Sequence, residues 1–250
     1  MPRPASSRPT SSRRSAGAGL ATPRPGAGRG RLPAGARTAS ADSRARLLQV
    51  GRAFVARHGL RGLTVRAVAQ KAGVNLGSFV YHFGTREAFI AELIEDWYAP
   101  FYGALQVTEQ TDAPPLVRLR ALLVQLLEFV VANRGFVLHV IADAATGEPA
   151  ARHFMQSLAA RHPAMLLRAL AESQEAGEIV RALPLQQMVF VLASSAVPVV
   201  VFTGLQQAKA LPRELAPALD AIADDLGAAV QRLDWALAGL RAGAAEGQRQ

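Results

Sequence analysis

Residues 64–89 constrain the fold of this 250-residue chain more than any other stretch. Thr64 can cap a helix with its hydroxyl group, and apolar residues recur behind it at helical spacing. Gly73 follows where a helix end favours a positive φ, and Asn75 can cap a second helix that ends near Phe83. Two short helices joined by a glycine-containing turn are typical of a helix-turn-helix, which we predict here.

Basic side chains are concentrated before and within this stretch. Residues 1–87 contain sixteen Arg and Lys and only two acids, whereas the rest of the chain is net acidic and the formal net charge of the whole is +9. A polyanion would therefore meet the first third of the chain, and nucleic acid is the polyanion that this pattern indicates. The absence of cysteine excludes disulfides and thiolate zinc sites.

Residues 1–41 consist mainly of Arg, Ser, Pro, Gly and Ala, and we expect them to be disordered because they offer little apolar surface to bury. We expect the same of residues 243–250. The apolar run at 16–23 is too short for a secretory signal. The arginines of the first segment either add a salt-sensitive attraction to DNA phosphates, or reflect coding bias, or precede the true start of the protein.

The predicted helix-turn-helix resembles that of the tetracycline-repressor (TetR) family of bacterial transcription regulators. The resemblance covers about residues 46–89, and its matches include Thr-Val-Arg from Thr64, Ala-Gly-Val from Ala72 and Tyr-His-Phe from Tyr81, in one register without gaps. It implies an all-α fold, with a three-helix DNA-binding domain at 42–88. A helical ligand-binding and dimerisation domain would follow at 89–242.

In a helix-turn-helix, the second short helix lies in the major groove with its N-terminal residues at the base edges. By resemblance, Arg66 and Ser78 are candidates for base contacts, whereas several neighbours would contact phosphates. Val80 stands where the family commonly has a tyrosine that contacts DNA, so the operator sequence cannot be carried over. The predicted DNA-binding residues are Thr64, Arg66, Asn75, Leu76, Ser78, Tyr81, His82 and Arg86.

Beyond residue 86 every strong hydrophobic period is helical, and no alternating run predicts a strand. Proline and glycine mark the expected breaks, including an interruption at Pro163. The predicted helices cover residues 86 to beyond 97, 116–132, 136–145, 150–176, 188–205 and 213–240.

Residues 188–205 carry no charge and are just long enough to span a membrane. Polar and helix-breaking residues interrupt the run, however, so we favour a helix buried in a dimer over a membrane span. Family resemblance implies that this helix and the one at 213–240 form a four-helix bundle with their mates in a homodimer.

The middle helices would then enclose a pocket for a small hydrophobic effector of unknown identity. His139 and Asp143 lie one helical turn apart, but with no thiolate and no second histidine at i+4 we predict no metal site, and we predict no cofactor. The candidate lining residues are Trp97, Phe101, Tyr102, Phe136, His139, Asp143, Phe154, Phe190 and Ser194.

The chain shows no glycine-rich phosphate loop, nucleophile elbow or paired carboxylates, so we do not expect an enzyme. We expect a ligand-responsive, sequence-specific transcription regulator, a repressor, that binds a palindromic operator in double-stranded DNA as a dimer in the bacterial cytoplasm. Two alternatives remain at this stage. One is a non-specific nucleic-acid binder driven by the basic tail, and the other is a membrane-anchored protein that spans at 188–205.

Overall fold

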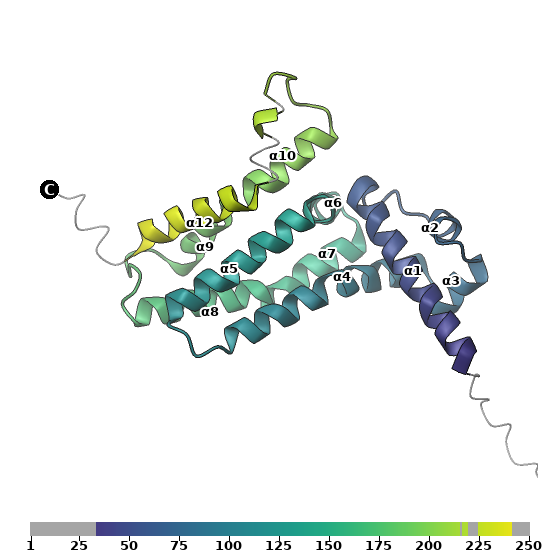
Figure 1. The fold of residues 1–250 in the computed structure, drawn as a ribbon, viewed down its shortest axis with the longest axis horizontal. Helices are drawn as coiled ribbons and strands as arrows, with labels where there is room; N and C mark the ends of the chain where they lie inside the picture. The colour runs from purple at the N-terminus through teal and green to yellow at the C-terminus, as the bar shows by residue number, and fades with distance from the viewer. Residues whose placement is uncertain (1–33, 216, 220–224, 242–250) are drawn as a thin grey trace, which may run out of the picture.

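The computed structural model describes residues 34–215, 217–219 and 225–241, and α-helices make up nearly all of its regular structure (Figure 1). One isolated bridge, between Ile179 and Arg241, is the only extended pairing among these residues. The all-α prediction is confirmed. The elements are α1 (Ala34–His58), α2 (Val65–Lys71), α3 (Leu76–Phe83), α4 (Arg86–Glu109), α5 (Pro115–Ala132), α6 (Arg134–Ala145), α7 (Pro149–Ser157), the 3-10 turn η1 (Leu158–Ala160), α8 (His162–Glu175), α9 (Leu185–Ala193), α10 (Val197–Gln207) and α12 (Leu226–Leu240).

Helices α1, α2 and α3 form a head at one end of the molecule, against the start of α4 (Figure 1). Three phenylalanines fix this arrangement. The Phe79 ring lies 5.3 Å from Phe83 and 5.0 Å from Phe89 between centroids, and Phe83 lies 4.8 Å from Phe89. All three are buried, so α3 is held to the core along one face while its other face is left outside.

Helix α1 starts earlier than the sequence pattern predicted. We expected order from residue 42, but the helix begins at Ala34, so residues 34–41 are helical and their predicted disorder is wrong. The reason is that alanine and arginine are good helix formers, and a helix that is already nucleated extends into such a stretch at little cost. Residues 1–33 and 242–250 lie outside the described residues.

The body consists of the helices from α4 onward. Helix α5 packs against α4, α8 and α12, whereas α6 contacts α1 of the head as well as α7 and α10. Helices α9, α10 and α12 lie along one side of the body, away from α4 (Figure 1). Helix α6 therefore meets the head, as the start of α4 does.

Two predicted helices of the C-terminal part differ from the structure. The apolar run at 188–205 is split, because α9 ends at Ala193 and α10 begins at Val197 with Pro198 in its first turn. Within the predicted helix 213–240, residues 217–219 are helical, residues 216 and 220–224 lie outside the described residues, and a separate helix begins at Leu226, where the Asp225 side chain accepts a hydrogen bond from the Ala228 amide at 3.0 Å.

The expected interruption near Pro163 is confirmed, because α7 and η1 end before α8 starts at His162. Among the described residues, no single helix has the length and apolar character needed to cross a membrane. Two bent helix pairs, α5 with α6 and α9 with α10, meet those criteria only when each pair is taken together.

Candidate nucleic-acid interface and ligand cavity

The turn between α2 and α3 is fixed by the side chains that the sequence singled out. Thr64 accepts a hydrogen bond from the Ala67 amide at 3.3 Å, and Asn75 accepts one from the Ser78 amide at 2.7 Å. Gly73 has φ +68°, which a residue with a side chain rarely adopts. These contacts define where each of the two helices begins and how they cross.

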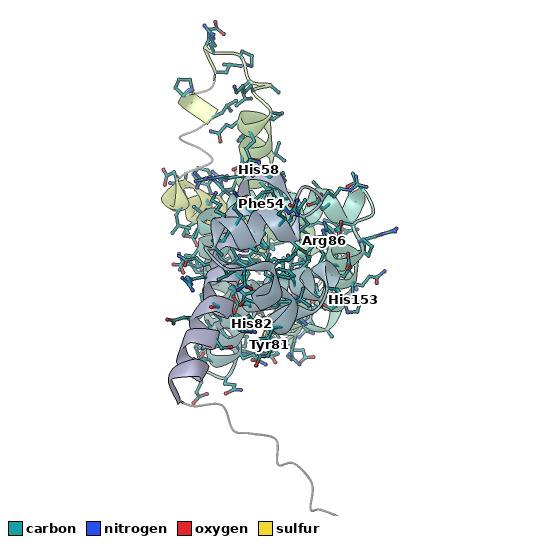
Figure 2. All side chains as sticks on the ribbon, turned by 90° about the vertical axis from the view of Figure 1, so that its right-hand side faces the viewer. Phe54, His58, Tyr81, His82, Arg86 and His153 are labelled. Carbon is teal, nitrogen blue, oxygen red and sulfur yellow. The ribbon has the colours of Figure 1, made fainter. Side chains whose placement is uncertain are left out.

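Helix α3 presents a continuous outer surface. Leu76, Val80 and Tyr81 are 50%, 53% and 69% exposed, although two of them are large apolar residues. The Tyr81 and His82 rings lie 5.1 Å apart between centroids, and the two side chains occur together on the head (Figure 2). An exposed apolar and aromatic helix face on a small domain marks an interaction surface.

The remaining predicted DNA-binding residues border this surface. Thr64, Arg66 and Asn75 are exposed, and Ser78 and His82 are half-buried. The side-chain oxygens of Thr64 and Asn75 already accept the hydrogen bonds that cap the two helices. A DNA contact of either residue would therefore use its remaining polar groups, such as the Asn75 side-chain NH₂. The contacts of these residues with DNA stay predictions.

The head is electropositive, and part of its charge is unpaired. Arg61, Arg66 and Lys71 are exposed and form no ion pair with any described residue. Burial, together with the nearby Arg44 guanidinium, lowers the pKa of His82. Arg44, which sequence reasoning did not single out, forms an ion pair with Glu92 and stacks over the Phe83 ring.

Arg86 is the clear exception among the predicted phosphate contacts. Its guanidinium donates to the backbone carbonyls of Leu60 at 2.7 Å and Leu63 at 2.9 Å, and it lies 3.4 Å from the Glu148 carboxylate. It points to the joint between head and body, apart from Tyr81 and His82 (Figure 2). Arg86 thus uses three of its five N–H donors to hold the turn before α2 and Glu148, and its contact with a DNA phosphate stays a prediction that this geometry does not favour.

Two of the candidate pocket residues belong to this same joint. Asp143 of α6 is buried and accepts a hydrogen bond from the Leu60 amide at 2.6 Å. His139 lies beside it, since a Cβ on Gly59 would come 2.9 Å from an Asp143 oxygen and 3.3 Å from the His139 Nδ1. Asp143 thus holds the head to the body, and neither residue lines the cavity, so their placement in the pocket is wrong. We name the contacts of Arg86 and Asp143 with residues 59–63, together with the Arg86–Glu148 pair, the head–body joint.

A cavity of about 210 Å³ lies in the body between α4, α5, α6, α7 and α8. Trp97, Phe101 and Phe154, three of the candidate pocket residues, line it together with Tyr98 and His162, which the sequence analysis missed; that an effector binds there stays a prediction. Tyr102 stacks behind Tyr98 with the rings 17° apart in plane, and the buried Phe136 ring lies 4.3 Å from Trp97 between centroids, but neither residue borders the cavity.

The last two candidates for the pocket lie on the outside. Phe190 is 78% exposed on α9, and Ser194 is exposed and donates its hydroxyl to the Val191 carbonyl at the end of the same helix. Their assignment to the pocket is wrong, because the helix turns this face away from the body. Within the described ranges, no group of three or more His, Asp or Glu side chains is arranged to hold a metal ion.

Comparison with known proteins agrees with the geometry of the head. Residues 47–93 match the family model of bacterial regulatory proteins, tetR family. The chain is 32% identical over 90 residues to the HTH-type transcriptional repressor KstR2 of Mycolicibacterium smegmatis, an alignment that spans 36% of this chain and 44% of that repressor. The chain thus matches less than half the length of this curated relative.

The whole fold is also found in solved structures. A TetR-family transcriptional regulator from Rhodococcus sp. superposes with a TM-score of 0.57 at 22% identity, covering 78% of this chain and 99% of that one. The structure of a SmeT–triclosan complex superposes with a TM-score of 0.60 at 19% identity, covering 80% and 93%. Residues 47–93 thus match the DNA-binding domain of the tetR family of bacterial regulatory proteins, and the chain shares the all-α fold of these solved structures.

Proposed function

We propose that the protein is a transcriptional repressor that binds a palindromic DNA operator as a homodimer and releases it when a small apolar molecule occupies the body. The observation that carries this proposal is the exposed surface of α3, which belongs to the same head as the exposed and unpaired cations Arg61, Arg66 and Lys71. Cations next to an exposed recognition helix supply phosphate attraction and base contacts together.

The homodimer is supported by the side of the body opposite α4. Phe190, Val197, Val201 and Trp235 on α9, α10 and α12 are 48% to 78% exposed. Large apolar side chains gathered on neighbouring helices favour burial against a second copy. A dimer is also what the function needs, because one head reads only half of a palindrome.

Release by a ligand is supported by helix α6, which takes part in both the cavity and the joint. Val137, Val140 and Ile141 of α6 line the cavity, and Asp143 on the same helix holds the Leu60 amide of the head. A ligand that fits the cavity better after α6 has shifted therefore favours a different position of the head. Because the ligand and DNA would favour different positions of the head, binding of the ligand would lower the affinity of the protein for DNA.

The proposed activity places the protein with the bacterial nucleoid, in the cytoplasm, as a regulator and not an enzyme. KstR2, which is similar in sequence over the head, is by its name a transcriptional repressor. SmeT, which has a similar fold, was solved in complex with the small molecule triclosan. Both agree with the proposal without identifying the effector of this chain.

The test is selection of bound DNA from a random duplex pool, with the full chain and with a variant that lacks residues 1–33. The deletion stops before α1, so the described head is left whole. We expect both proteins to enrich the same inverted repeat at physiological salt. If only the full chain binds, and without sequence preference, the protein is a general nucleic-acid binder that uses its arginine-rich segment, and the proposal is wrong.

A further inference from the structure

A second cavity adjoins the one described above. It has a volume of about 140 Å³ and lies between α5, α8, α9 and α12. Leu126 and His162 line both cavities, so these two side chains separate them. Ligand sites commonly measure about 300–1,000 Å³, a range that neither cavity reaches alone but both reach together.

Both cavities are almost entirely apolar. No Asp, Glu, Lys or Arg lines either of them, and Trp97 has already donated its indole N–H to Asn133 at 3.0 Å. Arg161 lies outside, over the Tyr98 and Phe154 rings, with its guanidinium bonded to both Glu95 oxygens at 2.9 and 3.0 Å. An ionised ligand group in these cavities would lose its hydration without gaining a partner of opposite charge.

The polar side chains left on the cavity walls are Tyr98 and His162, and they form one pair. The Tyr98 hydroxyl lies 2.8 Å from the His162 Nδ1. If Nδ1 carried the proton, the buried Tyr98 hydroxyl would have no acceptor among the described residues, so Tyr98 donates and the imidazole proton sits on Nε2.

The imidazole of this pair is neutral and keeps one donor free. Burial raises the pKa of Tyr98 to about 12 and lowers the pKa of His162 to about 4, so neither is charged near pH 7. The His162 Nε2–H has no hydrogen-bond partner among the described residues, and it stands at the wall between the two cavities.

We propose that the effector is a neutral, elongated and largely apolar molecule with one hydrogen-bond acceptor in its interior, placed on the His162 Nε2–H with an apolar arm in each cavity. This inference rests on the ligand-responsive function proposed above. It adds the chemical class of the effector, because acids and amines of the same shape would bind poorly between the apolar cavity walls. It also assigns His162 as the residue that donates a hydrogen bond to the acceptor of the effector.

The experiment measures binding of four matched compounds to the full-length protein by equilibrium dialysis at pH 7.5. Undecan-6-one has the central acceptor, and 6-methylideneundecane replaces its oxygen by a methylene group. Undecan-6-amine and 2-pentylheptanoate place a positive or a negative charge at the same position. We expect the ketone to bind about tenfold more tightly than the methylidene compound. We expect each charged compound to bind at least about a hundredfold more weakly than the ketone.

Two variants assign the preference to His162. His162→Phe fills the same space without a donor, and we expect it to bind ketone and methylidene compound equally. His162→Gln retains an N–H donor and should keep most of the preference, which a general packing defect would not allow. If none of the four compounds binds, if a charged one binds as tightly as the ketone, or if His162→Phe keeps the preference, the proposed class is wrong. Dialysis needs no DNA, so failure of the repressor proposal would show separately in the duplex selection.

Discussion

At the scale of single residues, Arg66 and Arg86 have opposite surroundings. Arg66 is exposed and unpaired, whereas Arg86 bonds Leu60, Leu63 and the buried Glu148. We expect Arg86→Ala to lower the free energy of unfolding by about 2–4 kcal/mol, because it removes several charge-assisted hydrogen bonds and leaves Glu148 unpaired. Urea denaturation followed by circular dichroism measures this.

The matched variant Arg66→Ala should leave the free energy of unfolding within about 0.5 kcal/mol of the parent. It should weaken binding to the selected duplex by about 1–3 kcal/mol and relax the preference at one base pair, as fluorescence anisotropy on a set of mutated duplexes would show. Equal loss on all duplexes would make Arg66 a phosphate contact.

We expect His82 to make DNA binding depend on pH. Burial and Arg44 lower the pKa of His82 in the free protein, whereas a DNA phosphate beside it would raise that pKa. Binding then takes up a proton, so affinity is highest below the pKa of the complex and falls as pH rises through it. We expect a decrease of up to about tenfold between about pH 6 and 8.

Anisotropy titrations at constant ionic strength measure this dependence, with His82→Gln as the comparison because it cannot be protonated. A parent protein whose affinity shows the same pH profile as His82→Gln would mean that no phosphate approaches His82. The surface of α3 would then meet DNA on the side of Leu76 and Ser78 alone.

At the scale of the elements, the joint between α1 and α6 depends on a glycine. Gly59 has φ +73°, and a Cβ there would come 2.9 Å from the Asp143 oxygen that holds the Leu60 amide. Gly73 has φ +68° but nothing within 4 Å of such a Cβ. A side chain at either position would cost free energy, because the backbone there has a positive φ. Only at Gly59 would the added Cβ also collide with Asp143 of the head–body joint.

We therefore expect Gly73→Ala to lower the free energy of unfolding by about 1–2 kcal/mol, which is the cost of the left-handed conformation. Gly59→Ala should lower it by at least about 1 kcal/mol more, because the Asp143 hydrogen bond is displaced as well. Equal losses in urea denaturation would mean that the joint adjusts without a change in free energy.

The helices also show which features of the fold can be predicted from the sequence. The helix-turn-helix was predicted closely because its signals are local, with Thr64 and Asn75 as caps and a glycine between the two helices. The single helix predicted at 213–240 missed the start of α12 at Leu226, because a capping side chain such as Asp225 can begin a helix without a change in hydrophobic pattern.

The functional residues that were missed or misplaced depend on contacts between distant parts of the chain. Asp143 and Leu60 are 83 residues apart, and Tyr98 and His162 are 64 apart. Periodicity gives the buried face of a helix but not the partner that the face meets, so His139 and Asp143 were placed in the pocket and His162 was overlooked. The partner of Arg86 was missed for the same reason, since Glu148 directly precedes α7 and is 62 residues away in the chain.

At the scale of the whole molecule, the proposed homodimer depends on the apolar side formed by α9, α10 and α12, which would bring the two heads together. Val201 on α10 is 48% exposed, and Val107 is 70% exposed near the end of α4, a helix that lies on the other side of the body from α10 (Figure 1). We expect Val201→Glu to convert a dimer to a monomer in sedimentation equilibrium, because two carboxylates would be buried against an apolar interface. Val107→Glu adds the same charge to a more exposed position and should leave the dimer unchanged.

The monomer should then lose most of its affinity for the inverted repeat but keep its affinity for a single half-site. Two heads read half-sites about 34 Å apart, and the linked pair gains over one head because the second contact is intramolecular. Anisotropy with full and half-site duplexes distinguishes this from a damaged head, which would weaken both equally. A Val201→Glu protein that stays dimeric would show that the two copies meet through another face, and the spacing of the operator halves would then have to be derived from that face.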